Sequence, residues 1–74
     1  MDCNNLSKGD LIYIPANVCL QDDPFEPRRT FITEVPRNAL FIHAARLSLD
    51  RYVKTLYDGG YWYVQERDIF PPKD

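Results

Sequence analysis

The most informative stretch of this chain is a pair of β-rich runs separated by an Asp-Gly-Gly turn. Residues 51–57 and 61–65 are rich in Tyr, Val, Thr and Trp, the residue types that favour β-strands. Between them, Asp58, Gly59 and Gly60 can supply the positive φ angles that a type I′ hairpin turn requires. The sequence therefore predicts an antiparallel hairpin close to the C-terminus.

A two-residue loop at either 58–59 or 59–60 divides the side chains of this hairpin between the same two faces, because successive strand residues point to opposite sides. One face carries no charge and holds the only tryptophan, so we expect it to face the core: Val53, Thr55, Tyr57, Trp62 and Val64. The other face should point outward: Tyr52, Lys54, Leu56, Tyr61, Tyr63 and Gln65. A bulge in either strand would reverse this assignment by one residue.

The N-terminal half of the chain contains two further strand patterns. Residues 9–15 are β-branched and aromatic between a Gly and a Pro, and residues 18–20 read as a short continuation past a bend. Residues 21–29 hold two prolines, five charges and one large apolar side chain, which predicts a long loop. Residues 30–35 predict the second strand, and residues 36–38 a turn after it.

The following apolar segment allows two interpretations. Residues 39–45 predict a third strand whose alternate side chains face opposite ways, Leu40 and Ile42 on one face and Phe41 and His43 on the other. A short helix over residues 39–49 is the alternative, since this stretch has three alanines and no breaker. We expect the strand.

Two short segments flank the hairpin. Residues 48–50 predict a turn that leads into it. Residues 67–70 are too few for a helix of their own and are followed by two prolines, so we expect one 3₁₀ turn and then an extended tail.

The order of these elements resembles that of SH3-like small β-barrels, in which five short strands pack as two orthogonal sheets and a 3₁₀ turn precedes the last strand. The resemblance implies an all-β, five-stranded SH3-like barrel over residues 1–74, with a long loop after the first strand. The chain lacks the Ala-Leu-Tyr-Asp-Tyr opening and the Trp-Trp pair of signalling SH3 domains, which argues against binding of proline-rich ligands.

Residues 8–15 (KGDLIYIP) and 57–71 (YDGGYWYVQERDIFP) also resemble small uncharacterised proteins of phages that infect cyanobacteria. This second resemblance implies a phage accessory or virion protein and no reaction.

Length and composition exclude several other classes. A chain of 74 residues supports one small domain, and its ten aromatic residues suit a small core. The net charge of −2 argues against a strongly basic nucleic-acid binder. No run of 18 apolar residues exists, and the N-terminus lacks the basic and apolar regions of a signal peptide. We therefore expect a cytoplasmic protein, located in the host cytoplasm or the virion if phage-encoded, that does not enter a membrane.

The residues that could carry chemistry are few. Cys3, Cys19 and His43 are too few to form a four-ligand zinc site, so we expect free thiols, no metal and no cofactor. Cys19 lies between Val18 and Leu20 and reads as a small core residue, and His43 reads as half-buried. No nucleophile elbow or phosphate-binding motif occurs, so we expect no enzyme. The acidic cluster Asp22, Asp23 and Glu26 is expected to be a solvated loop.

Charge is unevenly distributed along the chain. Residues 1–27 carry one lysine against five acidic residues, whereas residues 28–54 carry six basic residues against two acidic ones. The basic middle with its aromatic neighbours makes a nucleic-acid-binding barrel the alternative function. A Pro-x-x-Pro match at Pro24 and Pro27 is expected to stiffen the loop.

The sequence thus predicts a small non-enzymatic binding module whose partner is another protein, a host or virion component. Tyr and Arg are enriched in interface hot spots. The candidate surface combines the outward face of the hairpin with the long loop: Phe25, Arg28, Arg29, Tyr52, Leu56, Tyr61 and Tyr63.

Overall fold

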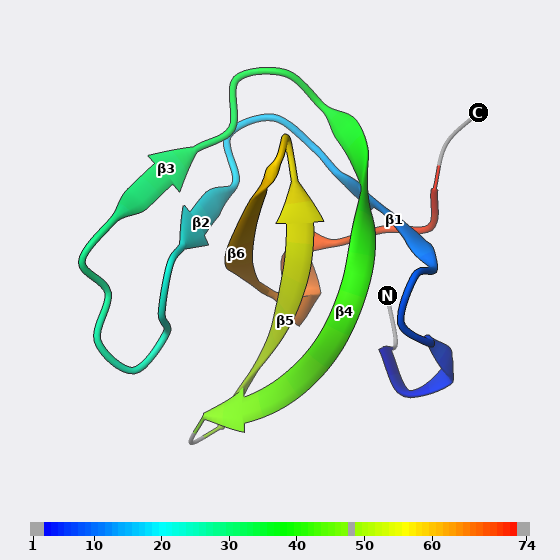
Figure 1. Ribbon diagram of the computed structural model, residues 1–74, viewed down its shortest axis with the longest axis horizontal. Coiled ribbons are helices and arrows are strands. Elements are labelled where there is room, and N and C mark those ends of the chain that lie inside the picture. The colour runs from blue at the N-terminus through cyan, green and yellow to red at the C-terminus, as the bar shows by residue number, and fades with distance from the viewer. Residues whose placement is uncertain (1–2, 48, 73–74) are drawn as a thin grey trace.

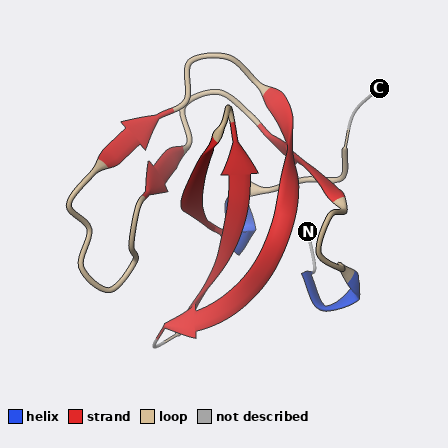
Figure 2. Ribbon diagram, in the orientation of Figure 1, coloured by secondary structure: helices blue, strands red, loops and turns tan. Residues whose placement is uncertain are grey.

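The chain forms one six-stranded antiparallel sheet with two short 3₁₀ turns, as the computed structural model shows for residues 3–47 and 49–72 (Figures 1 and 2). The strands lie side by side in the order β1-β4-β5-β6-β2-β3. The all-β prediction is confirmed, and the described residues contain six strands where five were expected. The elements are η1 (Cys3–Asn5), β1 (Leu11–Ile14), β2 (Cys19–Gln21), β3 (Thr30–Ile32), β4 (Arg37–Leu47), β5 (Asp50–Tyr57), β6 (Gly60–Gln65) and η2 (Glu66–Asp68).

The predicted C-terminal hairpin is confirmed as β5 and β6. Tyr57 pairs with Gly60, so the loop consists of Asp58 and Gly59 alone. Their φ angles are 48° and 80°, the positive values that a type I′ turn needs at both central positions. The pairs Val53 with Val64 and Thr55 with Trp62 place these residues on one face, as expected from the sequence, and the structure selects the loop at 58–59 over that at 59–60.

A single core lies on the concave side of the sheet. Ile12 on β1 and Leu20 on β2 belong to the same buried cluster, although their strands lie near opposite ends of the strand order. The sheet must therefore curl around this cluster, and Figure 1 shows the curvature most clearly in β4. The buried apolar members are Ile12, Ile14, Val18, Leu20, Ala39, Phe41, Val53, Tyr57, Val64 and Ile69.

The ambiguous apolar segment is a strand, as expected, and it is longer than residues 39–45. Residues 37–40 pair with β1 and residues 40–47 pair with β5, so Leu40 has a partner on both sides. The register shifts between Phe41 and His43, which is the signature of a β-bulge at Ile42. The bulge makes one side-chain prediction wrong, because it places His43 on the same face as Leu40 and opposite to Phe41.

The extra strand comes from the short run at residues 18–20. We expected it to continue the first strand, but the chain turns at Asn17, whose φ is 65°, and β2 pairs with β3 and β6 instead. The second predicted strand is shorter than residues 30–35, since β3 ends at Ile32. The long loop is present and spans residues 22–29. In the turn predicted at 48–50, Ser48 lies outside the described residues.

The end of β3 is fixed by a buried threonine that the sequence did not single out. Thr33 is fully buried, and its hydroxyl donates to the carbonyl of Pro15 at 2.7 Å and accepts from the N–H of Val18 at 3.0 Å. These bonds hold the bend before β2 against the end of β3.

The predicted 3₁₀ turn near the C-terminus is confirmed as η2. Beyond it, Ile69 enters the core and Phe70 pairs with Tyr13 through two backbone hydrogen bonds of 2.8 and 3.0 Å. The chain thereby returns to the outer edge of β1. Among the described residues, no helix has the length and apolar character needed to cross a membrane.

Candidate binding surfaces

A row of apolar side chains crosses the convex, outer face of the sheet. Strand pairing aligns Leu11 with Leu40, Leu40 with Leu56, and Leu56 with Tyr61. Leu11 is 47% exposed and Tyr61 is 60% exposed, so the row opens to solvent at both ends. Their neighbours Ile12 and Ala39 point the other way and are buried.

A second row, parallel to the first, combines aromatic rings with a cation. His43 pairs with Lys54, and Lys54 pairs with Tyr63. The Lys54 ammonium lies 5.1 Å from the ring centroid of Tyr61 and 6.0 Å from that of Tyr63, within the range of cation–π attraction. The rings of His43 and Tyr63 meet edge to face at 6.1 Å. We call the two rows together the outer face: Leu11, Leu40, Leu56, Tyr61, His43, Lys54 and Tyr63.

Four of the seven predicted contact residues lie on this side of the sheet. Leu56, Tyr61 and Tyr63 belong to the outer face itself. Tyr52 lies on the same side, opposite Gln65, whose amide is 3.5 Å from the Tyr52 hydroxyl. The sequence therefore placed these residues together correctly.

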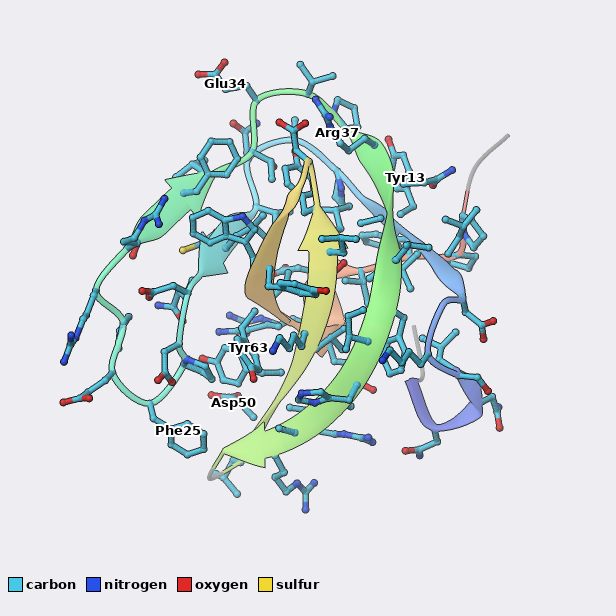
Figure 3. The ribbon with its side chains drawn as sticks, in the orientation of Figure 1. Tyr13, Phe25, Glu34, Arg37, Asp50 and Tyr63 are labelled. Atoms are coloured by element: carbon cyan, nitrogen blue, oxygen red, sulfur yellow. The ribbon has the colours of Figure 1, made fainter. Side chains whose placement is uncertain are left out.

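The other three predicted residues belong to the long loop. Phe25 is 67% exposed at the end of this loop (Figure 3). Arg28 and Arg29 are exposed near its return to β3. The Arg29 guanidinium lies 5.6 Å from the centroid of the Trp62 ring. Trp62 is on the opposite face of β6 from Tyr61 and Tyr63, so Arg29 lies on the other side of this strand from those two tyrosines.

Acidic side chains organise the long loop. The Asp22 carboxylate accepts hydrogen bonds from the backbone N–H groups of Arg28 and Arg29 at 3.0 and 3.1 Å. These bonds, that from Arg29 foremost, hold the pKa of the Asp22 carboxyl below its ordinary value. The Asp23 carboxylate accepts from the N–H of Phe25 at 2.9 Å. Two carboxylates of the predicted solvated cluster thus bind the loop's own backbone.

A small hollow, which we call the aromatic cleft, lies where the β2–β3 hairpin meets the β5–β6 turn. Its volume is about 130 Å³, and its lining consists of Phe31, Tyr57, Asp58 and Trp62. The Phe31 ring is tilted against both Trp62 and Tyr57, with 5.9 and 6.1 Å between ring centroids. Trp62 is partly buried and packs against the core cluster, as expected for a residue on the inward face of the hairpin.

Two other side-chain predictions are corrected. Cys19 is exposed with a free thiol, because on β2 it alternates with the buried Leu20, so it is not a core residue. His43 is exposed and not half-buried, because the bulge turns it to the outer face. The side chain of Cys3 lies outside the described residues. The part of the chain that the structure describes holds no group of three His, Cys, Asp or Glu side chains suited to a metal.

Sequence reasoning missed Leu11 and Leu40 as members of the outer face. Alternation along each strand could have indicated them, since Leu11 precedes the inward Ile12 and Leu40 precedes the inward Phe41. Their alignment with Leu56 and Tyr61 depends on strand pairing, which local sequence does not reveal.

Comparisons with protein-family models, with curated proteins and with solved structures yield no match to this chain. The exposed aromatic side chains of the described residues lie on the outer face (Tyr61), in the aromatic cleft (Phe31), on the long loop (Phe25) and beside β1 (Phe70).

Proposed function

We propose that the protein is a small non-enzymatic binding module that docks another protein on its outer face. The single observation that carries this proposal is the apolar row from Leu11 to Tyr61, which continues across four strands and is exposed at both ends. Contiguous exposed apolar patches on small domains mark contact sites. Tyr61 strengthens this assignment, because tyrosine combines a large apolar ring with a hydroxyl and is enriched in interface hot spots.

The second row supports a protein partner that presents both apolar and acidic side chains. Lys54 lies between the rings of Tyr61 and Tyr63 and brings one positive charge to the patch. A partner with an apolar centre and an acidic rim would satisfy both rows. The histidine at the end of the second row is exposed and available to the same partner.

The proposal includes an SH3-like barrel architecture. Two features support it: β4 is shared between β1 and β5, and a 3₁₀ turn precedes the segment that pairs with β1. Origin in a phage, with a host or virion protein as the partner, rests on residues 8–15 and 57–71 and stays a prediction.

The experiment that tests the proposal compares affinity capture by the natural chain and by a Tyr61→Ser, Tyr63→Ser double variant, using lysate of the organism that carries the gene. Loss of the two rings should weaken partner binding by about 2 kcal/mol or more, the scale of a hot spot. Phe70→Ser is the matched control, because Phe70 is 45% exposed outside the outer face. Unfolding in urea should show that both variants remain folded. Equal capture by the double variant and the natural chain would overturn the proposal.

A further inference from the structure

The aromatic cleft is flanked by two arginines that stack on its rings. Arg29 lies over Trp62 at 5.6 Å, and Arg37 lies over Tyr57 at 5.3 Å, each measured from the guanidinium carbon to the ring centroid. Phe31 touches both rings and bridges them. The result is one continuous series of side chains that comes from the long loop, β3, β4, β5 and β6.

The charge at this site is positive on balance. Arg37 pairs with Asp58, with 3.3 Å between Nη1 and Oδ1, and both side chains are largely exposed. Arg29 makes no salt bridge with any residue in 3–47 or 49–72. Its guanidinium therefore presents free hydrogen-bond donors beside an apolar ring, an arrangement that suits a carboxylate on a partner.

The shape of the cleft also depends on Gly60, which has no side chain. A Cβ on Gly60 would lie 3.1 Å from Nε1 of Trp62, a tight contact that would require the indole to shift by a few tenths of an ångström. The absence of that carbon lets the indole lie toward the turn and form one wall of the hollow. With a volume of about 130 Å³, the space can receive one large apolar side chain from a partner.

We propose that the aromatic cleft is a second recognition site, specific for an acidic peptide segment that inserts one large apolar side chain. Acidic residues on either side of the inserted one would reach Arg29 at one end and Arg37 at the other. The cleft lies on the opposite side of β6 from Tyr61 and Tyr63, so this site does not depend on the outer face. Single-stranded nucleic acid fits less well, because it needs several stacking platforms along a continuous positive groove, whereas this hollow is small and the Asp58 carboxylate is part of its lining.

The test uses selection of binders from a random peptide library, followed by titration of the chosen synthetic peptides. Trp62 is the only tryptophan, so its fluorescence reports occupancy of the cleft directly. We expect the selected peptides to carry acidic residues around a large apolar residue and to change Trp62 fluorescence. Arg29→Gln should weaken their binding roughly tenfold or more, since a charge-assisted pair is lost.

Matched variants separate this proposal from the one for the outer face. Arg46→Gln removes the same charge at the far end of β4 and should leave peptide affinity unchanged. The Tyr61→Ser, Tyr63→Ser variant should also bind these peptides normally, even if it loses the partner of the outer face. The proposal fails if no peptide is enriched, if the enriched peptides lack acidic residues, or if Arg29→Gln binds them as well as the natural chain. It also fails if oligothymidylate changes Trp62 fluorescence and the peptides do not, because the site would then take nucleic acid.

Discussion

The Asp22 carboxylate accepts a hydrogen bond from the backbone N–H of Arg29 at 3.1 Å and so closes the long loop. In return, the backbone N–H of Asp22 donates to the carbonyl of Arg29 at 3.1 Å. Arg29 is the residue that stacks on Trp62. The position of one arginine that flanks the aromatic cleft thus depends on a surface carboxylate.

This relationship predicts a pH-dependent loop. Because the hydrogen bonds lower the pKa of Asp22 in the folded state, the ionised carboxylate stabilises the loop fully above the ordinary aspartate value of 3.8. The stabilisation is lost as the pH falls through the lowered pKa. We expect the amide proton shifts of Arg28 and Arg29 to titrate together below pH 3.8 in NMR spectra. In Asp22→Asn this titration should disappear, and a midpoint at or above the ordinary value would contradict the prediction.

The buried hydroxyl of Thr33 should contribute measurably to stability. Thr33→Val keeps the shape of the side chain but leaves the N–H of Val18 and the carbonyl of Pro15 without their bonds to it. We expect a loss of about 1–3 kcal/mol in the free energy of unfolding, the cost of leaving a buried polar group unsatisfied. Urea denaturation measures it, with Thr30→Val on the exposed strand β3 as the control, expected within about 0.5 kcal/mol of the natural chain. Equal stability of the two variants would contradict this prediction.

The two glycines of the hairpin turn should respond differently to alanine. Gly59 has a φ of 80°, and no atom lies near the position that an added methyl group would take, so Gly59→Ala should cost about 1–2 kcal/mol through backbone strain alone. Gly60→Ala would instead push against the Trp62 indole and alter its fluorescence. Thermal unfolding and emission spectra of both variants distinguish these effects. A change in Trp62 emission in Gly59→Ala, with none in Gly60→Ala, would reverse the assignment.

The core should be more sensitive to truncation than the cleft. Ile12 is fully buried, so Ile12→Ala should cost about 2–5 kcal/mol through the lost burial and the cavity left behind. Trp62→Ala should cost less than this, because the indole is only half-buried and solvent can fill the space it leaves. Chemical denaturation of the two variants gives the comparison. If Trp62→Ala proves the more destabilising, the indole is a core residue after all.

Local patterns were sufficient for the parts of this fold that depend on neighbouring residues. The hairpin, its two-residue turn and its two faces follow from alternation and from Asp58 and Gly59, because turn chemistry and side-chain period act over a few residues. The same reasoning failed at His43, where one bulged residue reverses the alternation. Nothing in the run around Ile42 distinguishes a bulge from a regular strand.

The sequence by itself determined the all-β class, the hairpin with its two faces and the outward direction of Tyr61 and Tyr63. The tertiary structure alone decided which strands are neighbours, and with that the alignment of Leu11 with Tyr61 across four strands and the contact of Arg29 with Trp62. The physical reason is that strand pairing joins residues far apart in the chain through backbone hydrogen bonds. Those bonds are the same for every residue type, so only the closing of the common core selects among the alternative pairings.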